Sequence, residues 1–165
     1  MAQPALLLRR IEPGDEAFLY RVYVSTRAAE MDLVDWSESD KQAFLRQQFT
    51  AQHTHYQQHY AAAAFQVVLR GDAMIGRLYV DRGPNEIRII DIAILPEYRG
   101  HGVGTRLVRD LLGEARREQK VVTIHVERFN PALAWYQRLG FKPIVDRGVY
   151  LLMRWSAADQ VKTAS

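Results

Sequence analysis

The chain has 165 residues, enough for one domain with a hydrophobic core, and its 48% hydrophobic and 25% charged residues are typical of a globular protein. The formal net charge is only +3 and the basic residues are scattered, so no nucleic-acid partner is expected. The absence of cysteine excludes a disulfide framework, thiolate metal sites and cysteine nucleophiles.

Neither a secretory signal nor a membrane span is expected. The start of the chain, MAQPALLLRR, has a core of three leucines before two arginines, which is too short for the apolar region of a signal. No apolar run approaches the roughly 20 residues that cross a bilayer. We therefore expect a cytoplasmic protein with no membrane partner.

The first sixty residues predict a strand followed by two helices. The apolar run of residues 5–11 favours a strand, and Asp15 in the turn after it is a good N-terminal cap for a first helix. A second helix is predicted to begin near Ser39, where Ser39 and Gln42 form a capping box of the S-x-x-Q type.

The middle of the chain changes from helical to strand periodicity. Residues 65–70 and 73–82 flank a Gly71-Asp72 turn, which indicates a β-hairpin. Residues 85–95 are nearly apolar on both faces apart from Arg88 and Asp91, as is typical of a central strand.

The second half of the chain predicts alternating helices and strands. An amphipathic helix begins at Val103, a second central strand covers residues 121–126, and a short helix covers residues 131–140. Residues 141–155 predict a closing hairpin around Arg147-Gly148, and the last ten residues are polar and expected to fray.

This order of elements predicts one α+β domain over residues 1–155, with a mixed sheet, and a polar C-terminal tail over residues 156–165. The strand, loop, helix and strand between residues 86 and 127 form the one expected parallel crossover. The sequence shows no repeat, low-complexity tract or linker.

A glycine-rich loop carries the strongest chemical signal. The stretch LPEYRGHGVGTRLV, residues 95–108, leaves backbone N–H groups bare at a helix start, where they attract anions. A Walker loop is excluded because no lysine follows the glycines, and the dinucleotide fingerprint of an oxidoreductase lacks its third glycine in either register. The remaining pattern, [Q/R]-x-x-G-x-[G/A], is filled by Arg99, Gly102 and Gly104.

This loop resembles the coenzyme A loop of the GNAT superfamily of N-acetyltransferases. The segment NPALAWYQRLGF, residues 130–141, is similar to a second hallmark of that family, an asparagine followed by a helix with a tyrosine and a terminal L-G-F. The order of elements from residue 5 to 155 is similar too. The resemblance implies a mostly antiparallel sheet of about seven strands flanked by about four helices.

The resemblance also implies the activity and the ligands. It implies transfer of the acetyl group of acetyl-CoA, as co-substrate and without a metal, to a primary amine of a small molecule or peptide. The residues that it implies in binding acetyl-CoA are Ile92, Ala93, Ile94, Arg99, Gly100, His101, Gly102, Val103, Gly104, Thr105, Asn130 and Tyr136.

Acetyl transfer to an amine needs a base for the ammonium proton, a donor to the oxyanion and an acid for the leaving thiolate. The resemblance implies Glu86 as the base, often through a water in the family, and Tyr136 as the acid. Asp91 is the alternative base, or else a structural carboxylate paired with an arginine such as Arg88. The resemblance implies a backbone N–H near Ile94 and Leu95 as the oxyanion donor.

Several features leave alternatives open. Residues 30–40 hold five acids and no base, which favours an amine acceptor or is simply a solvated helix start. His53, His55 and His59 are interpreted as a hydrated helix surface rather than a metal site. The alternative function is a non-catalytic acyl-CoA-sensing module. Pairing through strand edges would give a homodimer, and the sequence leaves both monomer and dimer open.

Overall fold

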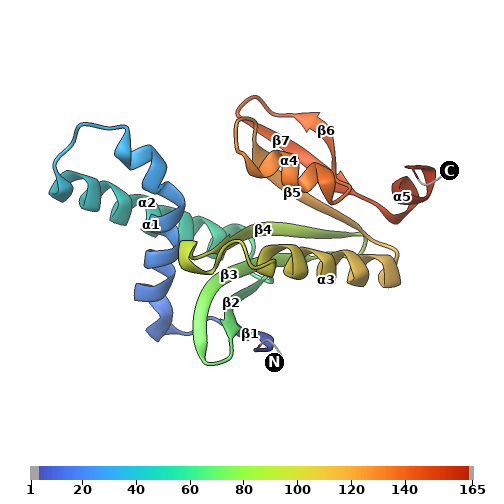
Figure 1. Cartoon of the computed structure of the whole chain (residues 1–165), viewed down its shortest axis with the longest axis horizontal. Coiled ribbons are helices and arrows are strands. Elements are labelled where there is room, and N and C mark those ends of the chain that lie inside the picture. Colours follow the sequence, from blue (N-terminus) through green and yellow to red (C-terminus); the bar gives the residue numbers. More distant parts are fainter. Residues whose placement is uncertain (1–3, 164–165) are drawn as a thin grey trace. The chain divides into compact units, whose positions relative to one another are not determined.

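The structure, a computed structural model, describes residues 4–163, with side chains up to residue 161 (Figure 1). Its strands are β1 (Leu6–Arg10), β2 (Ala64–Arg70), β3 (Ala73–Arg82), β4 (Glu86–Ile94), β5 (Val121–Glu127), β6 (Lys142–Asp146) and β7 (Tyr150–Trp155). Its α-helices are α1 (Glu16–Asp32), α2 (Glu38–His59), α3 (Val103–Glu118), α4 (Ala132–Arg138) and α5 (Ala157–Thr163). Two short 3-10 helices are η1 (Pro13–Asp15) and η2 (Pro96–Tyr98).

The seven strands form a sheet with the order β1-β2-β3-β4-β5-β7-β6. β4 and β5 pair in parallel, whereas β1 with β2, β5 with β7, and β6 with β7 pair antiparallel. The parallel pair is the one connected through α3, as predicted for residues 86–127. The predicted α+β fold with a mixed, mostly antiparallel sheet is therefore confirmed.

The chain divides into two compact units, each discontinuous in sequence. The first comprises the residues up to Tyr79 together with Asp91–His101, and the second comprises Val80–Ile90 together with the residues from Gly102. β3 and β4 therefore each contribute residues to both units. The expectation of one domain over residues 1–155 stays a prediction.

In the first unit, α1, α2 and β2 share a hydrophobic core. Phe49 lies in an aromatic group, with its ring centroid 5.4 Å from that of Tyr20 and 5.8 Å from that of Tyr23. Burial of these large side chains holds the two helices on the sheet. The fully buried members of the core are Leu19, Tyr23, Met31, Leu45, Phe49 and Val67.

The start of α1 differs from the predicted one. Asp15 is buried, and its carboxylate accepts hydrogen bonds from the Arg9 guanidinium at 2.9 and 3.1 Å and from the backbone N–H of Glu12 at 2.7 Å. Within the described residues, its side chain makes no capping bond to α1. Because a carboxylate binds an arginine more strongly than a neutral donor, Asp15 fastens β1 to η1 instead.

The predicted capping box at Ser39 and Gln42 is wrong. Ser37, in an extended conformation, is the N-cap of α2, and its hydroxyl accepts a hydrogen bond from the backbone N–H of Asp40 at 3.1 Å. Ser39 already lies inside the first turn. Gln42 instead accepts a hydrogen bond from the hydroxyl of Tyr20 at 3.2 Å.

In the second unit, α3 contacts β5 through one apolar face. Arg82, at the end of β3, binds Glu114 of α3 through two hydrogen bonds of 2.6 and 3.0 Å. The helix ends at Gln119, which has a left-handed backbone. The buried residues of α3 recur every three or four positions and are Val103, Leu107, Val108, Leu111, Leu112 and Ala115.

The C-terminal part forms the predicted hairpin and one unpredicted helix. β6 lies at the edge of the sheet with all five of its residues exposed, and its register with β7 shifts between Pro143 and Val145. Residues 157–163 of the tail predicted to fray instead form α5, and residues 164–165 lie outside the described residues. Gln160 of α5 donates a hydrogen bond to the carbonyl of Gly140 at 3.2 Å, which ties this helix back to the end of α4.

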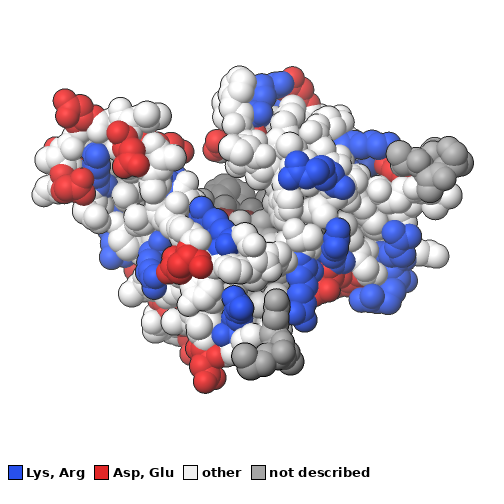
Figure 2. All heavy atoms as spheres, in the orientation of Figure 1, with Lys and Arg blue, Asp and Glu red and all other residues white. Residues whose placement is uncertain are grey.

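Charged side chains gather over two elements on the face that Figure 2 shows. Basic side chains lie over α3, where the exposed arginines are Arg106, Arg109, Arg116 and Arg117. Acidic side chains gather at the turn between α1 and α2, where Glu30, Asp32, Asp35, Glu38 and Asp40 are all exposed. In the described part of the chain, none of the helices combines the length and apolar character that a bilayer span requires.

We predict that Ser37→Ala lowers the free energy of unfolding by about 1 kcal/mol, because it leaves the N–H of Asp40 without its capping acceptor. Ser39→Ala is the matched control, since the Ser39 side chain is exposed within the first turn. Urea unfolding followed by circular dichroism measures both. Equal losses, or a larger loss for Ser39→Ala, would show that Ser37 is not the cap.

Candidate functional site

The glycine loop joins β4 to α3 with two residues in the left-handed region. Gly100 has a φ of 81° and Gly102 a φ of 75°, values that residues with a Cβ atom rarely adopt. Gly104, the third glycine of the loop, does not have a positive φ. Gly102 is also the N-cap residue of α3, so the left-handed turn of the backbone comes directly before the helix.

The start of α3 is left open to an anion. The first helical hydrogen bond runs from the N–H of Arg106 to the carbonyl of Gly102 at 3.0 Å, so the three preceding N–H groups have no acceptor within the helix. Gly102 has no side chain to cap them, and the first turn contains no acidic residue. Within the first turn, no side chain therefore offsets the partial positive charge of the helix end.

The entry to the loop is firmly held in the first unit. The guanidinium of Arg99 donates from Nε to the carbonyl of Ile94 at 2.8 Å, and the N–H of Leu95 donates to the carbonyl of Ile75 at 2.8 Å. Leu95 packs with Ala93 and with Val22 of α1. Arg99 therefore fixes the path of the backbone between β4 and the glycines.

β4 extends past its pairing with β5. Among the described residues, the parallel pairs run from Glu86 with Val121 to Ile89 with Ile124. β4 continues for five residues beyond the last of these pairs, to Ile94. Those five residues include Ile92, Ala93 and Ile94, the part of the strand that the resemblance implied in binding.

α4 carries two further residues that the sequence singled out. The side-chain oxygen of Asn130 accepts a hydrogen bond from the N–H of Ala132 at 2.8 Å, so Asn130 supports the first turn of α4. Tyr136 is buried, with its ring centroid 4.7 Å from that of Trp135 and 5.5 Å from that of Phe141. The indole N–H of Trp135 donates to the hydroxyl of Thr105 at 3.1 Å, which joins α4 to the first turn of α3.

Glu86 lies in a polar cluster that spans β4 and β5. Arg88 donates to its carboxylate from Nη2 at 2.8 Å and from Nε at 3.2 Å, and the hydroxyl of Thr123 donates to the same oxygen. Partial burial acts to raise the pKa of Glu86, but the bonds from Thr123 and Arg88 outweigh it and leave the pKa below its usual value. Glu86 is therefore a fixed, ionised carboxylate.

Asp91 pairs with a different arginine from the one expected. The guanidinium of Arg77 on β3, which is only 3% exposed, donates to its carboxylate at 2.7 Å and to Gln52 of α2 at 3.1 Å. The hydroxyl of Tyr56 lies 3.4 Å from the same carboxylate, and burial followed by the charge of Asp91 raises the pKa of Tyr56. Asp91 therefore pairs with Arg77 and not with Arg88, the arginine that the sequence suggested, and its role as a structural carboxylate stays a prediction.

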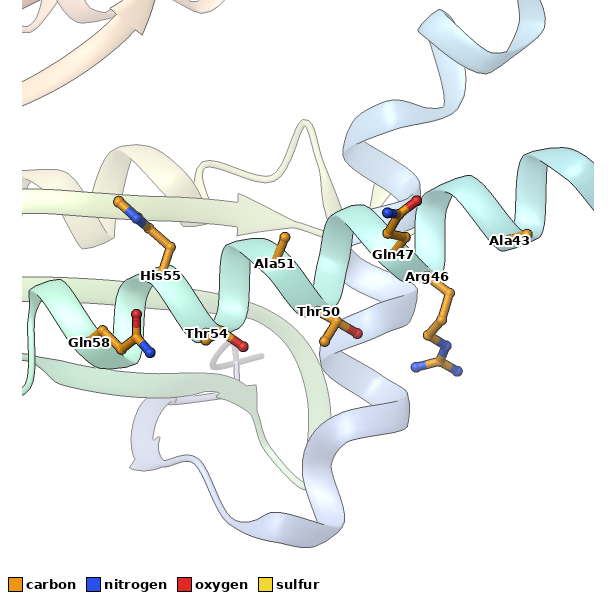
Figure 3. A pocket seen from close by; sticks show the side chains of 8 residues that line it. All are labelled: Ala43, Arg46, Gln47, Thr50, Ala51, Thr54, His55 and Gln58. Atoms are coloured by element: carbon orange, nitrogen blue, oxygen red, sulfur yellow. The ribbon is translucent and has the colours of Figure 1, made fainter.

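A separate hollow of about 600 Å³ lies along the exposed face of α2 (Figure 3). None of the residues that the sequence assigned to acetyl-CoA lines it. His55 is in it, and its ring stacks on that of His59 with 3.9 Å between the centroids. Among the described residues, no three His, Cys, Asp or Glu side chains gather where a metal could bind. The lining residues are Ala43, Arg46, Gln47, Thr50, Ala51, Thr54, His55 and Gln58.

Comparison with known proteins decides the family. The model of the Acetyltransferase (GNAT) family matches residues 27–141. The chain belongs to this family. The N-alpha-acetyltransferase RimI of Mycobacterium tuberculosis is 39% identical over 102 residues, which are 61% of this chain. The match also covers only 61% of the RimI protein, less than two thirds of its length.

Solved GNAT structures share the fold at low sequence identity. The PaiA N-acetyltransferase of Thermoplasma acidophilum, in complex with coenzyme A, matches with a TM-score of 0.69 at 17% identity, over 92% of this chain and 99% of that one. The ribosomal-protein-S18-alanine N-acetyltransferase of Escherichia coli matches with a TM-score of 0.63 at 16% identity, over 92% and 94%. These likenesses confirm the GNAT fold that the loop and element order implied.

Family membership supports the predicted enzyme class, an acetyl-CoA-dependent N-acetyltransferase, and the activity itself stays a proposal. The roles of individual residues stay predictions. Sequence reasoning missed Arg77, Thr123 and Trp135. Arg77 is the one charged residue in the buried run of residues 75–80, which was a usable signal, because a charge in such a run needs a partner.

We predict that Asp91→Asn lowers the free energy of unfolding by about 3 kcal/mol, because it leaves the buried guanidinium of Arg77 without its counter-charge. Glu114→Gln is the matched control, since its pair with Arg82 is partly exposed and should cost less than about 1 kcal/mol. Urea unfolding measures both variants. If the Asp91→Asn variant is as stable as wild type but inactive, Asp91 has a catalytic role instead.

Proposed function

We propose that this GNAT protein transfers the acetyl group of acetyl-CoA to a primary amine. The observation that carries the proposal is the start of α3, where N–H groups without a side-chain acceptor follow two left-handed glycines. A diphosphate needs such donors and a backbone that it can approach closely. The residues present therefore fit coenzyme A.

The binding residues follow from this geometry. The N–H groups of Val103, Gly104 and Thr105 are proposed to hold the pyrophosphate, with Gly100 and His101 completing the loop. Arg99 shapes the loop through its bond to Ile94. The segment Ile92–Ile94 lies beyond the pairs with β5, so its backbone can bind the pantetheine arm as an added strand would. For Asn130, a contact with the pantetheine arm is proposed from the resemblance alone.

Two side chains are proposed to move protons. Acetyl-CoA supplies an activated thioester, and the chain must remove a proton from the amine and return one to the thiolate. Glu86 is proposed as the base, or as the group that holds a base water, since its carboxylate stays ionised. Tyr136 is proposed as the acid, because a phenol hydroxyl can return a proton to the leaving thiolate.

The acceptor is proposed to be a primary amine of a small molecule or of a peptide N-terminus. The similarity to an N-alpha-acetyltransferase supports the peptide, and the exposed acids between α1 and α2 suit any cationic acceptor. We propose a cytoplasmic enzyme that acts as a monomer or homodimer. A non-catalytic acyl-CoA sensor is the alternative, and release of free thiol with an amine or peptide library separates the two.

We predict that Gly102→Val weakens coenzyme A binding at least tenfold by isothermal calorimetry, while the fold persists. A β-branched residue at a φ of 75° is strained by about 1–2 kcal/mol, and relief of that strain moves the first N–H groups of α3. Gly113→Ala is the control, because Gly113 lies in the same helix without a positive φ. Unchanged affinity in Gly102→Val would remove the loop from the site.

We predict that Glu86→Gln lowers kcat by about 10²–10⁴-fold near pH 7, the usual worth of a general base. Since the pKa of Glu86 is lowered, the carboxylate stays ionised to lower pH, and the acidic limb of the wild-type profile should lie below the usual range of a glutamate. Glu127→Gln, an exposed carboxylate on β5, is the control. Full activity in Glu86→Gln would assign proton removal to solvent or to the acceptor.

A further inference from the structure

We propose that Trp135 is a positioning residue that couples the first turn of α3 to Tyr136. This inference rests on the proposed coenzyme A site and adds to it a mechanical link between ligand binding and the residue proposed as the acid. The two helices and the residues concerned all belong to the second unit of the chain.

The first half of the link is the contact between Trp135 and α3. The indole N–H donates to the hydroxyl of Thr105 at 3.1 Å, and indole has no other donor to offer. A Cβ atom on Gly104 would lie 3.7 Å from two atoms of the same ring, so the ring faces the backbone of Gly104 at a distance that leaves room for a methyl group. Trp135 therefore binds one of the three residues whose N–H groups are proposed to hold the pyrophosphate, and its ring faces a second.

The second half of the link is the contact between Trp135 and Tyr136. Their ring centroids are 4.7 Å apart with an interplanar angle of 61°, and Phe141 lies against Tyr136 at 5.5 Å. Tyr136 is thus held between two aromatic rings. If the ring of Trp135 shifts on α3, the ring of Tyr136 has to shift with it.

The short length of α4 makes this contact decisive. α4 has seven residues, and so short a helix is not stable by itself. Its orientation is therefore set by what it packs on. The hydrogen bond from Trp135 to Thr105 is a directional contact of α4 with the proposed ligand-binding turn, so it can fix both the rotation of α4 and the position of Tyr136.

A double-mutant cycle, with kcat as the measured quantity, separates a positioning role of Trp135 from a contribution to stability alone. Trp135→Phe keeps an aromatic ring and removes the donor, and Thr105→Val removes the acceptor at nearly constant volume. Each change should lower kcat about five- to tenfold, the worth of one hydrogen bond, with less than a threefold change in KM for acetyl-CoA. The double variant should be no worse than the worse single variant.

The cycle also tests whether the effect passes through Tyr136. In a Tyr136→Phe background, Trp135→Phe should lower kcat no further, because the hydroxyl that it positions is already gone. Additive losses in either cycle would overturn the inference. If Trp135 had a merely structural role, the losses would be additive in this way. Trp135→Phe would then lower kcat by the same factor in wild type and in the Tyr136→Phe background.

Binding without turnover gives an independent readout. Coenzyme A should change the tryptophan emission of wild type and of Trp36→Phe, and this change should be absent in Trp135→Phe. Calorimetry on the same samples distinguishes a failure of the coupling from a failure of coenzyme A binding. Coenzyme A that binds while the emission of Trp135 stays constant overturns the coupling alone, whereas coenzyme A that does not bind overturns the proposed function and the coupling with it.

Discussion

The backbone N–H groups at the start of α3 need an acceptor that the first turn of the helix does not supply. The proposed site is arranged around this constraint. A helix start usually contains an acidic side chain or a capping hydroxyl, and α3 has neither within its first turn. The chain enters the helix through residues that have no side chain to offer, and Arg99 is turned back toward β4. These donors therefore remain available to an anion, in place of a cap that the chain itself would supply.

Local sequence signals predicted the parts of the fold that depend on local backbone geometry. The turn at Gly71-Asp72, the start of α3 after Gly102 and the closing hairpin were all found, because glycine and alternating apolar residues determine local conformation directly. The N-cap of α2 was misplaced because Ser37 and Ser39 are chemically equivalent as caps. Only the extended backbone at Ser37 distinguishes them.

Pairs of side chains from different elements were harder to predict. Arg88 was matched with Asp91, three positions away, but successive strand residues face opposite sides, and Arg88 binds Glu86 two positions away. That error was avoidable from the sequence. The hydrogen bond from Thr123 to Glu86 was not predictable, since it depends on the parallel register that sets Arg88 opposite Thr123. The same holds for Trp135 and Thr105, which are thirty residues apart on two helices.

The sheet ends at β6, and the manner of its ending limits how copies of this chain can associate. A strand edge invites another strand to extend its hydrogen-bond ladder, which is a route to uncontrolled aggregation. In β6, Pro143 lacks the N–H that such a ladder requires, and the register shift next to it bends the edge out of line. Two copies that meet at this edge would therefore join through side chains, and the sheet would not become continuous between them.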